Sequence, residues 1–229
     1  MMERILNVLK SVTYLAALVA IVAYFDDCGR RRDQTVLDAW ALFHQVKEIR
    51  GEGGREQALE TLADNGESLA GIDVCGAQFP DLDLPGADLG HACLDSVWAF
   101  EADLRGARMH RVSAVGAILT RATLEDAVLR RARLQGASFE YANLSGANLW
   151  GADLSDARLA GAKLVGSYLG QVDFSGADLR NCDLRGIRSW RRIRSLMRTN
   201  LWGVVNPPRG FIAWARDTMG AIQDTSSSH

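Results

Sequence analysis

A repeat of five residues runs through the middle of the chain. Residues 141–164 read YANLSGANLWGADLSDARLAGAKL, so each unit contains Ala, a polar residue and Leu, followed by two small or polar residues. Neither regular secondary structure has this period, because a helix repeats every 3.6 residues and a strand every two. The repeat therefore excludes a straight helix or a straight strand.

Each unit predicts a short extended segment followed by a turn. Ala142 and Leu144 lie two residues apart, so an extended backbone places both side chains on the same face. Since five is an odd number, a straight strand would send the next pair to the opposite face, and the chain must turn once per unit. Turns of about 90° close a square coil of about 20 residues with Ala and Leu inside, and such coils stack about 4.8 Å apart.

The same frame extends far beyond this segment. The central position is apolar in every unit from Val74 to Leu184, and the position two residues earlier is Ala in most units. Self-similarity at a fixed period is typical of a solenoid. Ala99 and Ala114 occupy central positions, so we expect the interior to be thin beside them.

Several units resemble the pentapeptide-repeat family, notably ADLRG at 102–106, ANLSG at 142–146, ADLSD at 152–156 and ADLRN at 177–181. The resemblance implies an all-β solenoid, a right-handed quadrilateral β-helix, which we expect over residues 71–188 with flanking α-helices. The motif is highly specific for a fold and poorly specific for a function. The order of the preceding segments resembles that of membrane-anchored members, most of which lack an assigned activity.

Residues 1–33 are predicted to be a transmembrane anchor with a basic flank. Residues 5–25, ILNVLKSVTYLAALVAIVAYF, would form a helix about 31 Å long, enough to cross a hydrocarbon core. A secretory signal peptide is the alternative, but no clean small-residue cleavage site follows, and residues 30–32 are all Arg. We therefore expect a single-pass membrane protein, with the repeat domain in the cytosol because the flank after the span is slightly more positive.

Helical segments are expected on both sides of the repeats. Residues 34–70 are predicted to form a helical linker and an N-terminal cap, with helices over about 34–50 and 55–63, because stacked coils expose unpaired backbone at their ends. Residues 189–229 are predicted to form a helical C-terminal cap and a disordered tail. In this segment Trp190, Ile193, Leu196 and Met197 fit a short helix, and a second helix is expected after Pro207 and Pro208.

Catalysis finds no support in the sequence. The four cysteines, Cys28, Cys75, Cys93 and Cys182, contain no CxxC pair, so neither a zinc site nor a disulfide framework is expected. We interpret them as small buried hydrophobic residues or surface thiols in a reducing compartment. The four His residues are scattered, and no nucleophile motif is present. We expect neither an enzyme nor a bound cofactor or metal.

Positive charge gathers in two places, although the net charge is only −2. Residues 20 apart should stack on one side of the coil, which places Arg111 over Arg131, and a second cluster follows the repeats. The candidate interaction surface consists of Arg111, Arg130, Arg131, Arg133, Arg191, Arg192 and Arg194. A solvated surface without a ligand is the alternative interpretation.

These observations favour a membrane-tethered, non-enzymatic scaffold that presents a rigid surface to a protein partner. One alternative comes from the family resemblance, since some members mimic duplex DNA and bind type II topoisomerases. That mechanism needs a strongly acidic rod, whereas this repeat region is only mildly acidic. A lipid-binding module that uses the basic ends is the other alternative. We do not expect nucleic acid as a partner.

Overall fold

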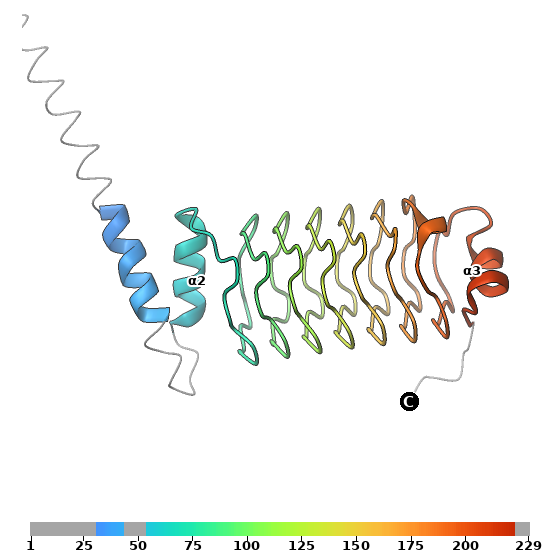
Figure 1. The fold of residues 1–229 in the computed structure, drawn as a ribbon, viewed down its shortest axis with the longest axis horizontal. Coiled ribbons are helices and arrows are strands. Elements are labelled where there is room, and N and C mark those ends of the chain that lie inside the picture. The colour runs from blue at the N-terminus through green and yellow to red at the C-terminus, as the bar shows by residue number, and fades with distance from the viewer. Residues whose placement is uncertain (1–30, 44–53, 223–229) are drawn as a thin grey trace, which may run out of the picture.

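The computed structural model describes residues 31–43 and 54–222 of the chain. A helical segment at 31–43 is followed by α2 (Arg55–Asp64), a long stack of coils, the short 3-10 helix η2 (Trp190–Arg192) and α3 (Phe211–Met219). Figure 1 shows an elongated rod with α2 across its N-terminal end and α3 across its C-terminal end. The coils therefore lie between two helical covers.

Parallel bridges join each coil to the next. On one side of the rod, Asp73 pairs with Cys93, Cys93 with Ser113 and Ser113 with Arg133, and every step is 20 residues. The Val74 N–H donates to the Cys93 carbonyl at 3.0 Å, and the Cys93 N–H donates to the Ile72 carbonyl at 2.8 Å. Since one coil holds 20 residues and one unit holds five, each coil has four walls, as the repeat predicts.

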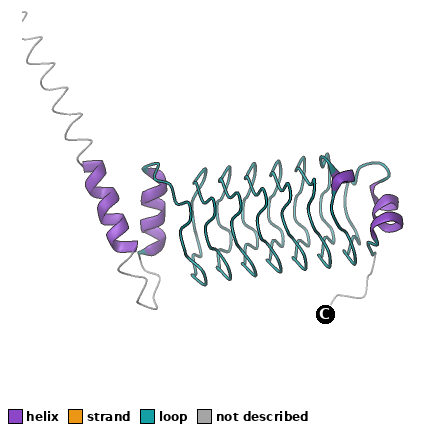
Figure 2. Cartoon of the chain, viewed as in Figure 1, coloured by secondary structure: helices purple, strands orange, loops and turns teal. Residues whose placement is uncertain are grey.

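Each wall is too short to form a regular strand. In the described part of the chain, only isolated bridges occur within the coils, and Figure 2 draws the coils as loop between purple helices. A single bridge residue is followed by a turn whose last residue has positive φ, for example Arg111 at 55° and Gly146 at 71°. Cornering once per unit leaves no room for a longer ladder on any wall. The expected solenoid of β-coils with flanking helices is confirmed.

The interior is dry and closely filled. Ala142, Leu144, Ala147 and Leu149 are each at most 1% exposed, so both inward positions of the unit point to the axis as predicted. Burial of each such Leu contributes about 1.5–3 kcal/mol. A cavity of about 20 Å³ with an entirely apolar lining that includes Ala99 confirms the expected thin place. Ala114 is buried but does not line this cavity.

The cap helix α2 covers the first coil with both apolar and polar groups. Ala58, Leu59 and Leu62 are buried. On the same helix, the Glu56 carboxylate accepts a hydrogen bond from the Asp81 N–H at 3.2 Å, and the Glu60 carboxylate accepts one from the Asp83 N–H at 3.1 Å. These carboxylates occupy backbone donors that the first coil cannot pair with a preceding coil.

The other end differs from the expectation. Only Trp190–Arg192 is helical there, because the bridges continue past residue 188 with Asp173 paired to Ser195 and Asp178 to Asn200. The step has grown from 20 to 22 residues, and Leu196 points inward with 0% exposure. The predicted helix through Met197 is therefore wrong, since these apolar residues continue the solenoid. Beyond them, Trp190 packs edge-on against Phe211 and Trp214 of the cap helix α3, with ring centroids 5.6 and 5.1 Å apart.

The expected membrane span needs a correction. No helix within residues 31–43 and 54–222 is long and apolar enough to cross a bilayer, and this finding contradicts the predicted single-pass membrane localisation. The longest helical segment among them, 31–43, extends only about 20 Å, against about 30 Å of hydrocarbon. The segment predicted to span, residues 5–25, lies outside the described residues.

Candidate interaction surface

One corner of the solenoid carries a row of cationic side chains. The corner is formed by the turn residues 90–91, 110–111, 130–131, 150–151, 170–171 and 191–192, which we call the basic ridge. Hydrogen bonds link its successive turns: the Arg111 N–H donates to the Arg130 carbonyl at 2.9 Å, and the Gln171 N–H donates to the Arg192 carbonyl at 2.6 Å. Residues far apart in the sequence thus form one continuous edge.

The five arginines of this ridge face solvent. Arg111, Arg130, Arg131, Arg191 and Arg192 are all exposed, and no Asp or Glu lies among the ridge residues. Over the described ranges, Arg111, Arg130, Arg131 and Arg192 form no ion pair with the protein. Arg191 lies over the Trp190 ring, 4.1 Å from its centroid. Like charges one coil apart repel each other, so an anionic partner would relieve a repulsion that the fold itself imposes.

The remaining two predicted residues lie beside the ridge. Arg133 is exposed on the adjoining wall, two residues after the ridge turn, where it bridges Ser113 and Asp153 through the backbone. Arg194 forms an ion pair with Asp173 at 2.7 Å. The structure thus gathers Arg111, Arg130, Arg131, Arg133, Arg191 and Arg192 along one edge, whereas Arg194 already has an acidic partner.

The other three corners have a different charge pattern. Each of them contains acidic side chains: Asp95 and Asp156 on the first, Asp81, Glu101 and Glu140 on the second, and Glu125 and Asp126 on the third. Arginines near these corners are also paired, as Arg180 is with Asp178 and Arg185 with Asp183. Arg105 bonds to Asp103 and holds the pKa of that carboxyl below its usual value. Only the basic ridge therefore offers a run of cations without carboxylates.

Two rings pack onto glycines along this ridge. Neither Gly90 nor Gly170 is in the left-handed region, but a Cβ added to Gly90 would overlap the His110 ring, and one added to Gly170 would overlap the Trp150 ring. His110 also meets His91 edge-on, with ring centroids 5.1 Å apart. The sequence analysis missed these seats, although Gly followed by an aromatic or His one coil away is a signal that the period makes visible.

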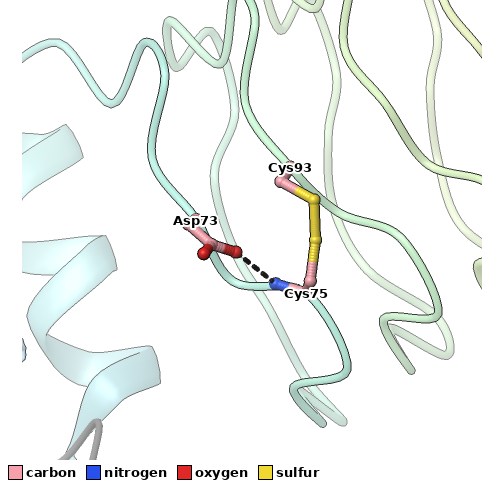
Figure 3. A group of neighbouring side chains, drawn as sticks. All are labelled: Asp73, Cys75 and Cys93. Atoms are coloured by element: carbon pink, nitrogen blue, oxygen red, sulfur yellow. Dashed lines mark hydrogen bonds between the residues drawn. A yellow bond between two sulfur atoms is a disulfide. The ribbon is translucent and has the colours of Figure 1, made fainter.

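The cysteines also need a correction. Cys75 and Cys93 form a disulfide between neighbouring coils, with Cα atoms 5.5 Å apart, so the expectation that no disulfide forms is wrong (Figure 3). The separation of 18 residues is close to one coil, and spacing rules for short motifs do not register such a contact. Cys182 is fully buried in an Ala position as expected, and burial raises the pKa of its thiol. Cys28 lies outside the described residues.

Comparisons with known proteins agree with the repeat. A family model described as pentapeptide repeats matches residues 119–151 and 152–188 in eight copies. The match also supports the right-handed sense that the resemblance implies for the coil. The matched region begins after the units in which Phe79, Val97 and Ala99 depart from the common Ala and Leu. A search of curated proteins finds no match.

Solved structures of repeat proteins are similar to this chain. A pentapeptide repeat protein, Rfr23, from the cyanobacterium Cyanothece 51142 is 23% identical, with 65% of this chain and 97% of that chain covered and a TM-score of 0.34. One from the Arabidopsis thaliana thylakoid lumen is 20% identical, with 71% and 82% covered and a TM-score of 0.27. Full-length QnrB1, a plasmid-mediated fluoroquinolone resistance protein, is 16% identical, with 67% and 92% covered and a TM-score of 0.35.

Proposed function

Because the chain belongs to the pentapeptide-repeat family through residues 119–188, we propose that it is a non-enzymatic scaffold that binds a protein partner along its basic ridge. The observation that carries this proposal is the row of five exposed arginines on a corner without carboxylates. The partner that fits such a row is a protein with an acidic surface. Opposite charges steer the encounter of two proteins and suppress wrong partners.

The rigidity of the rod supports this function. Backbone hydrogen bonds of 2.6–3.0 Å tie each turn of the basic ridge to the next, so the arginines are displayed at fixed steps of about 4.8 Å. A surface that is already ordered loses little conformational entropy on binding. The side chains of the ridge must still be immobilised, at a cost of about 0.5–1.5 kcal/mol each.

The interior supports a non-enzymatic role. Ala and Leu side chains fill the coils, and the apolar cavity beside Ala99 measures about 20 Å³. This volume holds at most one water-sized molecule, and its lining offers no polar group to a substrate. The function is therefore assigned to the outer surface of the rod.

The alternatives are less well supported. Mimicry of duplex DNA needs a continuous acidic surface, whereas cations and carboxylates alternate on three corners and the fourth is basic. Lipid binding through the C-terminal arginines is weakened because Arg185 and Arg194 are paired with Asp183 and Asp173. Pairing inside the protein reduces the charge that either residue offers to a membrane.

The test compares charge reversals on two corners. The ridge variant carries Arg111→Glu, Arg130→Glu and Arg131→Glu, and the control carries Arg105→Glu, Arg121→Glu and Arg158→Glu, which change the net charge equally. We expect the wild-type chain and the control to capture the same acidic protein from lysate of the native cells, and the ridge variant to lose it. Binding should also weaken with added salt, because exposed charges are screened. If the ridge variant captures the same proteins as the wild type, the ridge is not the binding surface.

A further inference from the structure

A second group of side chains with distinctive chemistry lies at the N-terminal end of the rod. Asp73 and Cys93 face each other in a parallel bridge on the first two coils, and Cys75 follows Asp73 by two residues. Figure 3 shows the Asp73 side chain directed toward Cys75, whose N–H donates to the Asp73 carboxylate at 3.2 Å. The two Sγ atoms and a carboxylate oxygen all lie within 4.8 Å of one another.

The backbone holds these three residues firmly in place. The Val74 N–H donates to the Cys93 carbonyl at 3.0 Å, the Cys93 N–H to the Ile72 carbonyl at 2.8 Å and the Gly76 N–H to the Asp95 carbonyl at 2.8 Å. These bonds depend on the coil and not on the disulfide. The residues should therefore remain neighbours when the disulfide is opened.

The position is also accessible. Cys75 and Asp73 are exposed and Cys93 is half-buried, whereas Cys182 is fully buried. A reductant and an ion from solution can thus reach Cys75 and Cys93. Both residues lie away from the basic ridge arginines, so the chemistry of this group is independent of the proposed scaffold function.

We propose that Asp73, Cys75 and Cys93 form a binding site for a thiophilic divalent cation, with Zn²⁺ as the fitting ion, when the disulfide is reduced. Thiolates select soft or borderline cations over Mg²⁺ and Ca²⁺. Zn²⁺ binds thiolate sulfur at about 2.3 Å and carboxylate oxygen at about 2.0–2.2 Å, so small side-chain rotations bring the three ligands around one ion. Water completes a tetrahedral set.

The chemistry balances in two steps. A dithiol reductant transfers two electrons and two protons to the Cys75–Cys93 bond, so that the S–S bond breaks, two thiols form and the reductant becomes a disulfide. Zn²⁺ then replaces the two thiol protons, which are released to solvent, and binds the resulting thiolates and the Asp73 carboxylate. The same residues are thus a covalent link in the oxidised chain and a metal site in the reduced chain.

The test uses the full chain with Cys28→Ser and Cys182→Ala, so that Cys75 and Cys93 are the remaining thiols. The protein is reduced with a phosphine under anaerobic conditions and titrated with Co²⁺. We expect sulfur-to-cobalt charge-transfer absorption that saturates at one equivalent and disappears when Zn²⁺ is added. Cys75→Ser or Cys93→Ser should remove the absorption, and Asp73→Asn should lower the affinity by about tenfold or more.

A second measurement keeps the test decisive if a variant folds poorly. In the reduced chain with both cysteines intact, saturating Zn²⁺ should slow alkylation of Cys75 and Cys93, while the oxidised chain should bind no cobalt. The proposal is overturned if the reduced chain shows neither charge-transfer absorption nor protection from alkylation. It is equally overturned if Cys93→Ser retains the full absorption. Neither result would bear on partner capture by the basic ridge.

Discussion

The Glu60 carboxylate in α2 accepts a hydrogen bond from the Asp83 N–H, 3.1 Å away on the open edge of the first coil. The side chain of a helix thus takes the place of a missing coil. Removing it should leave this donor without its protein partner, at a cost of about 1 kcal/mol because the edge is partly hydrated. We expect Glu60→Ala to lower the free energy of unfolding by this amount in urea titrations, and Gln57→Ala, on the exposed side of α2, to have no effect. Equal losses in both variants would contradict the capping role of Glu60.

The disulfide should stabilise the N-terminal coils. It closes a loop with a sequence separation of 18 residues, and loops of this size contribute about 3 kcal/mol when they are cross-linked. We expect reduction in the absence of metal to lower the free energy of unfolding by about this amount. The Cys75→Ser, Cys93→Ser double variant should unfold like the reduced chain and should not respond to reductant. A response in that variant would place the sensitive group elsewhere.

The cavity beside Ala99 should accept a larger side chain. Ala99→Val adds methyl groups where the lining is apolar, so we expect the free energy of unfolding to rise by about 0.5–1 kcal/mol. Ala114 occupies the same position of its unit but lines no such cavity, and Ala114→Val should destabilise by about 1 kcal/mol or more through overpacking. Differential scanning calorimetry of the pair checks the difference. Stabilisation by both substitutions would show that the core is loose throughout.

The Trp150 ring should depend on the absence of a side chain at Gly170. Because the backbone of Gly170 is not in the left-handed region, Gly170→Ala acts through its contact with the ring. We expect this variant to lose about 1–3 kcal/mol, as for other overpacked sites. The loss should shrink in the Trp150→Ala background, where the space is free. A double-mutant cycle in urea measures the coupling, and additive effects would exclude the contact as the cause.

The ion pair between Asp173 and Arg194 should contribute to stability in a defined pH range. Burial alone would raise the pKa of Asp173, but hydrogen bonds from Ser175 and Arg194 outweigh it, and the pKa lies below its usual value. A carboxyl with a lowered pKa in the folded chain stabilises above its unfolded pKa of about 3.9, and the contribution disappears as the pH falls through the folded pKa. We expect Asp173→Asn to lower the melting temperature at pH 6 and to have little effect at pH 2. An equal loss at both pH values would assign the effect to packing.

The period of five was sufficient to predict the coil and its inward residues. Leu144 and Leu149 are buried because their frame leaves no other place for them once the chain turns in each unit. The stacking of Arg111 on the following coil was also predictable, since residues one coil apart are 20 residues apart in the sequence. The positions of Arg191 and Arg194 were not. Around η2 the step lengthens, so counting by 20 from Asp173 misses its contact with Arg194.

The disulfide could have been inferred from the same arithmetic. Cys93 lies one coil after Asp73, and Cys75 lies two residues after Asp73, so the repeat frame alone brings the two sulfur atoms onto neighbouring rungs. Rules based on closely spaced cysteines fail here because contacts in a solenoid arise at the length of a coil. The carboxylates of Glu56 and Glu60 could not be foreseen, since their role depends on how α2 is oriented over the coil.

The 20-residue step between bridged positions links sequence length to surface direction. Deleting a whole coil between Arg111 and Arg130 would shorten the rod and leave every downstream side chain pointing the same way. Deleting a single unit there would rotate everything after it by a quarter turn, so that Arg130 and Arg131 would no longer align with Arg111. Gene variants that lose or gain repeats can therefore preserve this edge only in multiples of four units.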